Sequence, residues 1–177
     1  LHAAGVLRDR LLPGLASEAL SIVFASTGIA AANIHTAALS SGLQRLVLYS
    51  SVVAAFGNVG QGNYAAANTF MDVLALARRA AGSTAQSLQL PAVLGLGMGA
   101  SMLSAMLANN AISPAEYKAS LAALLTVSVQ GTVLAPLPLV LLQGMERDLS
   151  LLIGLRPMFD SMTYGYDAAD GAATTER

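Results

Sequence analysis

Three polar side chains have the types and spacing needed for chemistry on a carbonyl group: Ser51, Tyr64 and Asn68. Tyr64 and Asn68 are four residues apart near the start of an expected helix, so their side chains share one face. Ser51 closes an expected strand, and parallel sheets bind ligands at the carboxyl ends of their strands. A serine there can hold a carbonyl oxygen by a hydrogen bond, while a tyrosine gives that oxygen a proton as hydride reaches the carbon. A phenol has a pKa of about 10, so it needs a nearby cation to act well near neutral pH.

Spacing alone leaves simpler interpretations open. A single tyrosine in an alanine-rich helix is more often a packing or surface residue, a serine at a strand end is usually a cap, and Asn68 can equally lie on the helix surface. His35 is interpreted as a packing or surface residue, because no second histidine lies within ligand reach in the sequence, and no metal site is expected. Met98, Met102 and Met106 are four apart and form a stripe that is more typical of a core than of a binding surface.

Helix and strand signals alternate along the chain. The expected helices are 15–41, 63–81, 98–110 and 114–125, and the expected strands are 46–49, 86–90 and 132–135. Ser113 and Pro114 give the last helix a clear start, whereas the glycine-rich segment 52–62 is predicted to be a loop. This alternation predicts an α/β fold with a parallel sheet. Three strands are too few for a stable doubly wound sheet, so the chain is interpreted as part of a larger domain.

Composition narrows the possible functions. The chain is 55% hydrophobic and 11% charged, against roughly 25% charged in soluble proteins. No membrane span is expected, because polar residues, glycines and prolines interrupt the long uncharged stretches. A net charge of −1 without a basic stripe argues against nucleic acid binding. The chain has no cysteine, which excludes disulfides and thiol chemistry and is compatible with a cytoplasmic or plastid location.

Several segments resemble one protein family in the order in which that family has them. The run from Tyr49 to Asp72, YSSVVAAFGNVGQGNYAAANTFMD, is similar to the active-site signature of polyketide synthase ketoreductases, which belong to the short-chain dehydrogenase/reductase superfamily. HAAGVLRDRLL at 2–12, ARRAAG at 77–82 and GLGM at 95–98 resemble further segments of that family. The resemblance implies a partial Rossmann-like fold whose N-terminal nucleotide-binding half is missing. Residues 1–142 would be the C-terminal part of a ketoreductase domain, with a lid at about 98–125, and 143–177 a linker or tail.

The resemblance also implies roles for individual residues. Tyr64 would be the general acid, Ser51 the carbonyl-binding hydroxyl and Asn68 the supporting amide of the family's tetrad. The residues implied to bind the cofactor, NADPH, are His2, Ala3, Ala4, Gly5, Leu90 and Pro91. The implied reaction is reduction of a β-ketoacyl chain tethered by phosphopantetheine to an acyl carrier protein, beside other synthase domains.

Two departures from the family pattern bear on activity. Thr27 stands where the family has the lysine of its tetrad, and no Lys or Arg occurs from Leu11 to Gln44. Arg78 and Arg79 cannot substitute, because they lie about 20 Å along the expected helix from Tyr64. The glycine-rich phosphate loop is also absent, so we expect the isolated chain to fold weakly and not to bind NADPH.

These departures keep two alternatives open. The first is a non-catalytic, structural ketoreductase-like domain of a synthase, which Thr27 favours. The second is a free-standing short-chain dehydrogenase, which is disfavoured because Asn68 stands where those enzymes have their lysine. The segment Leu7-Arg8-Asp9 resembles the Leu-Asp-Asp signature of ketoreductases that give the D-configured alcohol, and Phe56 stands where the opposite class has Trp.

Overall fold

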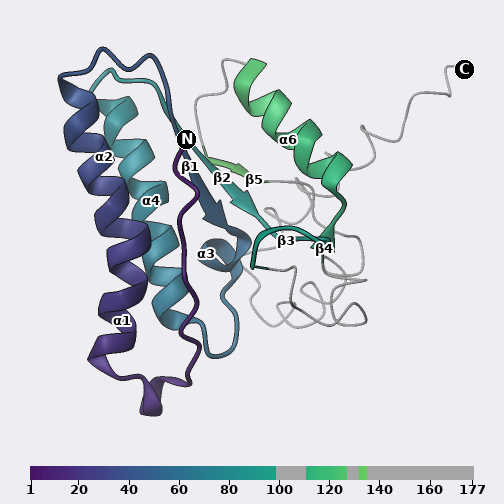
Figure 1. The fold of residues 1–177 in the computed structure, drawn as a ribbon. Coiled ribbons are helices and arrows are strands. Elements are labelled where there is room, and N and C mark those ends of the chain that lie inside the picture. Colours follow the sequence, from purple (N-terminus) through teal and green to yellow (C-terminus); the bar gives the residue numbers. More distant parts are fainter. Residues whose placement is uncertain (99–110, 127–131, 135–177) are drawn as a thin grey trace, which may run out of the picture.

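The computed structural model describes residues 1–98, 111–126 and 132–134, which form a parallel sheet with helices on both faces (Figure 1). The three-stranded sheet has the order β1 (Leu46–Ser51), β2 (Ala85–Leu90), β5 (Thr132–Leu134), and all its pairs are parallel. The predicted α/β class and the three predicted strands are therefore confirmed. Most of the helix expected over 98–110, and the whole of 143–177, lie outside the described residues.

Strand β1 separates two apolar clusters, which explains its continuous hydrophobic sequence. Its side chains alternate between the faces of the sheet, and both faces of a parallel sheet are usually covered. The cluster on one face consists of Ala31, Leu46, Leu48, Met71, Ala75 and Ala85. The cluster on the other face consists of Val47, Leu88, Ile112 and Leu124. Because β1 is packed on both faces, its position in the sheet is fixed, and so is the position of Ser50 and Ser51 at its end.

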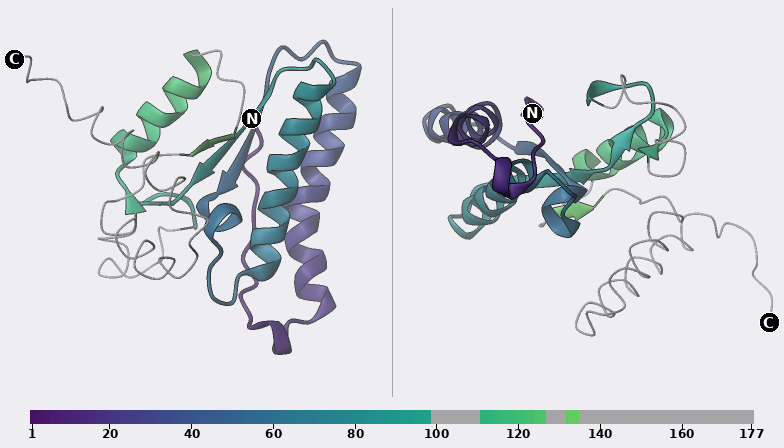
Figure 2. Two further views of the ribbon diagram at one scale, coloured as in Figure 1. Left: turned by 180° about the vertical axis from the view of Figure 1, so that it is seen from behind. Right: turned by 90° about the horizontal axis from the view of Figure 1, so that it is seen from below.

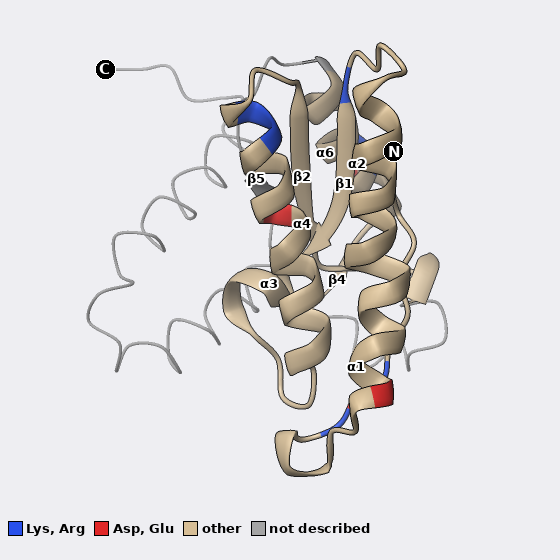
Figure 3. Ribbon diagram, turned by 90° about the vertical axis from the view of Figure 1, so that its left-hand side faces the viewer, with Lys and Arg blue, Asp and Glu red and all other residues tan. Residues whose placement is uncertain are grey.

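One face of the sheet is covered by two long helical segments that lie side by side (Figures 1 and 3). The first runs without a break through α1 (Ser17–Phe24), a π-helical turn (Ala25–Ile29) and α2 (Ala30–Leu39), after a short 3-10 turn at Leu12–Gly14. The second is α4 (Gly62–Ala80). Both helices were predicted, but the π-helical turn was not.

The two helical segments approach closely at Gly28. The rings of Phe24 and Phe70 meet edge to face there, with centroids 6.5 Å apart. A Cβ at Gly28 would lie 3.1 Å from the Phe24 ring and 3.2 Å from the Phe70 ring. The absence of a side chain at Gly28 therefore allows Phe24 and Phe70 to pack against each other between the two helical segments.

The segment Ser17–Leu39 is the one described helix that is long and apolar enough to cross a membrane, with a mean hydropathy of 1.4. Length and composition are weak evidence for a span, because packed helices of α/β domains pass the same test. Figure 3 shows long uncharged stretches on this helix and on α4, against which it packs.

Three short elements were not predicted. Helix α3 (Val52–Phe56) replaces the first half of the expected loop over 52–62, because Ser51 caps it by accepting a hydrogen bond from the Val53 amide at 3.2 Å. Strands β3 (Ala92–Val93) and β4 (Ala111–Ile112) form a separate parallel pair. The predicted loop is thus wrong for 52–56, because a single side-chain cap is enough to start one helical turn.

The edge of β1 that does not pair with β2 contacts the N-terminal segment at His2. His2 forms an isolated parallel bridge with Leu48, in which its amide donates to the Val47 carbonyl and its carbonyl accepts from the Tyr49 amide, both at 2.9 Å. This bridge brings the N-terminal segment alongside the strand that carries Ser51 (Figure 2).

Helix α6 (Pro114–Thr126) lies on the opposite face of the sheet from α4 and is fixed at both ends. Its start is a capping box: Ser113 Oγ accepts from the Glu116 amide at 3.2 Å, and a Glu116 carboxylate oxygen accepts from the Ser113 amide at 2.7 Å. At its other end, the Arg45 guanidinium donates to the carbonyls of Leu124 and Leu125 at 3.2 and 2.7 Å. The predicted start of this helix is confirmed.

We predict that Ser113→Ala lowers the free energy of unfolding by about 1 kcal/mol, because one helix-end amide loses its acceptor. Hydrogen exchange should quicken in the first turn of α6, as measured by mass spectrometry. Ser17→Ala is the matched control, since Ser17 is exposed and its hydroxyl bonds only its neighbour Glu18, at 3.4 Å. Equal stability of the Ser113 and Ser17 variants would show that the capping box does not hold α6.

Candidate active site

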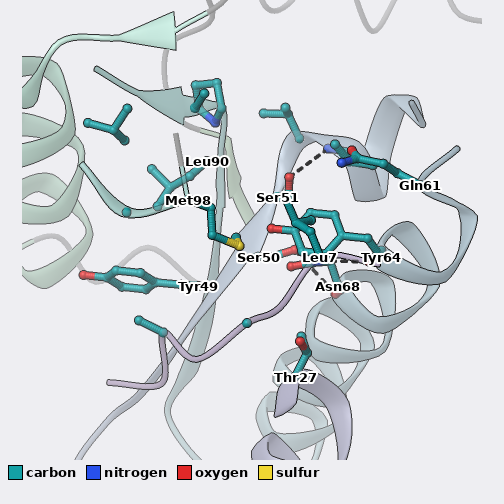
Figure 4. A pocket seen from close by; sticks show the side chains of 18 of the residues that line it. Leu7, Thr27, Tyr49, Ser50, Ser51, Gln61, Tyr64, Asn68, Leu90 and Met98 are labelled. Carbon is teal, nitrogen blue, oxygen red and sulfur yellow. Dashed lines mark hydrogen bonds between the residues drawn. The ribbon is translucent and has the colours of Figure 1, made fainter. Parts of the chain in front are cut away.

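A cavity of about 470 Å³ opens at the carboxyl ends of β1 and β2 (Figure 4). Its walls come from the N-terminal segment, the π-helical turn, β1, α3, α4, the segment after β2, and α6. The volume falls within the range of about 300–1,000 Å³ that is typical of ligand pockets. Ser51, Tyr64 and Asn68 all contribute to its lining, so the fold brings together the three residues that the sequence singled out.

The Tyr64 hydroxyl lies against the end of β1, close to the side chains of Ser51 and Asn68, which favour its ionised form by hydrogen bonding. Burial is the largest influence on its pKa and raises it. The two hydrogen bonds lower the pKa, the negative charge of Asp9 raises it, and the net result is a pKa above the ordinary value of 10.0. Tyr64 is therefore a neutral hydroxyl, a proton donor rather than a phenolate, throughout the neutral pH range.

Asn68 holds the start of α4 in place behind this hydroxyl. Its side-chain nitrogen donates to the Tyr64 carbonyl at 2.9 Å, and its own carbonyl accepts from Ser50 Oγ at 3.4 Å. Asn68 is 1% exposed, which removes the surface interpretation that spacing had left open. Because Ser50 belongs to β1, this hydrogen bond links β1 directly to α4, close to the Ser51 and Tyr64 hydroxyls.

Asn63 is a further positioning residue, and the sequence analysis missed it. It is 1% exposed, its side-chain oxygen accepts from the Tyr64 amide and its nitrogen donates to the Arg8 carbonyl, both at 2.9 Å. Its place beside Gly62, at the first turn of α4, is the only signal that the sequence offers, and an Asn there commonly caps a helix.

The N-terminal segment is fastened to the loop between α3 and α4 at the mouth of the cavity. Asp9 accepts a hydrogen bond from the Gln61 side chain at 2.8 Å, and the Arg10 amide donates to the Gly60 carbonyl at 2.8 Å. Gly60 has a φ of +78°, a left-handed conformation that favours glycine at this contact. Gln61 also lines the cavity, so the segment that resembles the stereochemical signature lies close to Tyr64.

Five of the six residues expected at the cofactor line the cavity: Ala3, Ala4, Gly5, Leu90 and Pro91. His2 lies outside this lining. It is 4% exposed, and its ring Nε2 donates to the Thr27 carbonyl at 3.1 Å. The structure therefore gives His2 a place in the packing between the N-terminal segment and the π-helical turn.

Thr27 faces the cavity from the π-helical turn and is 1% exposed. Among the described residues, no Lys or Arg lines the cavity. Arg78 instead contacts His35, with 2.6 Å between Nη1 and Nδ1, and Arg79 donates to the Ala85 carbonyl at 3.1 Å. These partners support the expectation that neither arginine replaces the missing lysine, and they give His35 a packing role.

Within the described parts of the chain, no group of three His, Asp or Glu side chains could hold a metal ion.

We predict that Tyr64 ionises above pH 10.0, because burial favours the neutral phenol. The phenolate absorbance difference between wild type and Tyr64→Phe, followed during an alkaline titration, measures this pKa. By linkage, the free energy of unfolding should be unaffected by Tyr64 below pH 10.0 and should fall above it, more steeply in the wild type than in Tyr64→Phe. A midpoint below 10.0 would contradict the geometry, since it would require a cation beside the hydroxyl.

Comparison with known sequences identifies a family. The family model for the KR domain matches residues 1–95, more than half of the chain. Polyketide synthase GfsA of Streptomyces halstedii is 49% identical over 88 residues, which cover 50% of this chain and 1% of the relative. The 6-methylsalicylic acid synthase of Penicillium terrestre is 40% identical over 108 residues, which cover 60% of this chain and 6% of the relative. The chain thus spans only a small fraction of these long synthases.

Solved structures agree with the sequence matches. The first ketoreductase of the tylosin PKS superposes with a TM-score of 0.68 at 31% identity, covering 82% of this chain and 33% of that one. An A1-type ketoreductase gives a TM-score of 0.72 at 27% identity, covering 81% and 32%. Both are α/β proteins of the short-chain dehydrogenase type, which confirms the partial Rossmann-like fold. The chain belongs to the ketoreductase (KR) domain family of polyketide synthases.

Proposed function

We propose that this chain carries the carbonyl-reducing site of a polyketide synthase and acts, with NADPH, on a β-ketoacyl chain tethered to an acyl carrier protein. The product would be the β-hydroxyacyl chain. The observation that carries the proposal is the placing of the Ser51 and Tyr64 hydroxyls close together in the wall of a ligand-sized cavity. Relatives named as polyketide synthases support the substrate class and the presence of carrier and other synthase domains as partners.

In this proposal the substrate's carbonyl oxygen lies between Ser51 and Tyr64. Ser51 Oγ accepts from the Val53 amide, which leaves the hydroxyl proton free to be donated to the carbonyl. Tyr64 gives its proton to the oxygen as the carbon gains hydride, so the product forms as a neutral alcohol. A solvent proton then restores the Tyr64 hydroxyl. NADPH, when bound, supplies the hydride and leaves as NADP⁺.

The lining fits one end of such a cofactor. Ala3, Ala4 and Gly5 present little side-chain bulk, so a flat ring can approach their backbone beside Leu90 and Pro91. The 177 residues contain no G-x-G-x-x-G turn to hold the phosphates. We therefore place only the nicotinamide end against this chain and assign the phosphate contacts to another part of the protein.

Thr27 supports a second candidate, a structural domain without catalysis. No cationic side chain of residues 1–98, 111–126 or 132–134 lines the cavity, and the pKa of Tyr64 is raised rather than lowered. A donor with a pKa far above the working pH transfers its proton less readily. We accordingly propose that reduction is slow in the natural sequence and that the missing lysine is the reason.

We predict that Tyr64→Phe in the full-length protein lowers kcat for ketone reduction by about 100-fold or more, because the general acid is lost. Ser51→Ala should cost about 100-fold, the effect of removing one aligned hydrogen-bond donor. Turnover is measured as NADPH oxidation with a β-ketoacyl thioester. Thr69→Ala, on the exposed side of α4, is the control and should keep full activity. Undiminished turnover by Tyr64→Phe would rule out the proposed acid.

A lysine at position 27 tests the two candidates against each other. We predict that Thr27→Lys raises kcat about tenfold or more and moves the pH–rate profile to lower pH, because the cation lowers the pKa of Tyr64. Thr36→Lys adds the same charge to an exposed position of the same helical segment and should have no effect. Reduction by the wild type as fast as by Thr27→Lys would disprove impairment. No reduction by either protein would favour the structural domain.

A further inference from the structure

A second pair of hydroxyls lines the cavity away from Ser51 and Tyr64. The Oη atoms of Tyr49, on β1, and Tyr117, on α6, are 3.0 Å apart. Their rings meet edge to face, with centroids 6.3 Å apart and an interplanar angle of 78°. Both rings are half-buried and both contribute to the cavity lining. Figure 4 shows Tyr49 and Tyr64 on opposite sides of Met98.

The geometry of β1 relates the two hydroxyl pairs. Tyr49 and Ser51 are two residues apart, so their side chains leave the same face of the strand at Cα positions roughly 6.6 Å apart. The lining also includes the apolar side chains of Leu90, Val93 and Met98. The cavity therefore has two polar parts, Ser51 with Tyr64 and Tyr49 with Tyr117, together with apolar walls.

The second pair has hydrogen-bonding capacity to spare. Each phenol has one donor and two acceptor lone pairs, and the bond between Tyr49 and Tyr117 uses one donor and one lone pair. Among the described residues, these two hydroxyls have no other hydrogen-bond partner. One donor and several lone pairs are thus left for a ligand. A group that both accepts and donates, such as an amide, would satisfy them.

The electrostatics favour a neutral group over an ion. Burial, and then the hydrogen bond and proximity of Tyr117, raise the pKa of Tyr49 far above the ordinary phenol value. The pair therefore stays uncharged at neutral pH. In the part of the chain that the structure describes, no Lys, Arg, Asp or Glu lines the cavity, so a charged ligand group would contact no counter-charge from these residues.

We propose that Tyr49 and Tyr117 form a second binding subsite, which takes an amide group of a ligand whose reacting carbon lies at Ser51 and Tyr64. This inference rests on the proposed function. Two ligands of that reaction carry amides: the nicotinamide ring has a carboxamide, and the phosphopantetheine arm has amides along its length. Both present an N–H donor and a carbonyl acceptor, which is the complement of the hydroxyl pair.

The test compares ligands with and without this amide, in the full-length protein. Tyr117→Phe removes one hydroxyl and keeps the ring and its packing. One arm compares NADPH with its 3-acetylpyridine analogue, in which a methyl ketone keeps the carbonyl acceptor but has no N–H donor. The other arm compares a β-ketoacyl N-acetylcysteamine thioester, which has an amide, with the S-butyl thioester of the same acid, which keeps the thioester and has no amide.

We expect Tyr117→Phe to raise KM about threefold to tenfold for the amide-bearing member of one arm, with kcat unchanged, the size expected for one lost hydrogen bond. KM for the amide-free thioester should not change, and KM for the 3-acetylpyridine analogue, which keeps only the carbonyl acceptor, should change less than KM for NADPH. The arm that responds identifies whether the cofactor or the carrier arm supplies the amide. The subsite would be overturned if KM changed equally for amide-bearing and amide-free ligands, which is the result that a loosened α6 would give. It would also be overturned if KM changed in neither arm.

Equilibrium binding separates this inference from the proposed function. If the wild type reduces no ketone, the proposed function fails, and titration calorimetry with NADPH and with the N-acetylcysteamine thioester still tests the subsite. The dissociation constant of one of them should rise about threefold to tenfold in Tyr117→Phe. Equal affinity in both proteins, or no binding of either ligand to the wild type, would overturn the subsite.

Discussion

The parallel pairing of β1 with β2 is the constraint on which the cavity depends. Their register runs from Leu46 opposite Ala85 to Ser51 opposite Leu90, so both strands end at the same level. At that level β1 passes into α3 and β2 passes into Pro91, and the space beyond them is the cavity. A shift of one residue would turn the side chain of Ser51 to the other face of the sheet. The apolar clusters on both faces of β1 oppose such a shift, because every buried side chain would have to change faces.

The two sides of the cavity are held in place by different kinds of contact. Its reactive side is held by short polar contacts in which Asn63 and Asn68 fix the backbone on either side of Tyr64. Its other side is held by apolar packing of α6 on the sheet, with Arg45 and a capping box at the helix ends. The tyrosine pair bridges β1 and α6, so the position of α6 bears directly on what the cavity can bind.

The described residues that line the cavity include no cation, and this affects how readily Tyr64 can give up its proton. A buried phenol with a raised pKa can donate a hydrogen bond readily, but it gives up its proton reluctantly. Thr27 lies in a π-helical turn, a form that is rare and often found at functional sites. Its side chain supplies a hydroxyl at the position where the resemblance to the family predicts a lysine.

Much of this architecture follows from local sequence signals. The long helices, the three strands and the start of α6 have periodicity or caps that act within a few residues, so they could be predicted. The grouping of Ser51, Tyr64 and Asn68 could also be predicted, because a strand end and a helix face allow it and the resemblance to the family's signature favours it over the simpler interpretations.

Other features depend on contacts between distant segments, which no local signal reveals. Helix α3 and the two-residue strands β3 and β4 are too short for periodicity. The bond of Asp9 to Gln61 and that of Asn63 to Arg8 join residues more than fifty apart in the sequence. The side chain of His2 bonds to the Thr27 carbonyl, an acceptor that only the folded chain brings near, and its expected role at the cofactor stays a prediction.

The central claim is that the Ser51 and Tyr64 hydroxyls meet a single carbonyl oxygen in this cavity. A crystal structure of the full-length protein with NADP⁺ and a non-reducible β-ketoacyl analogue tests it most directly. We expect the ketone oxygen within hydrogen-bond distance of both hydroxyl oxygens, with the nicotinamide ring beside Leu90 and Pro91. A ketone bound elsewhere, or a Tyr64 hydroxyl turned away from it into packed side chains, would contradict the account.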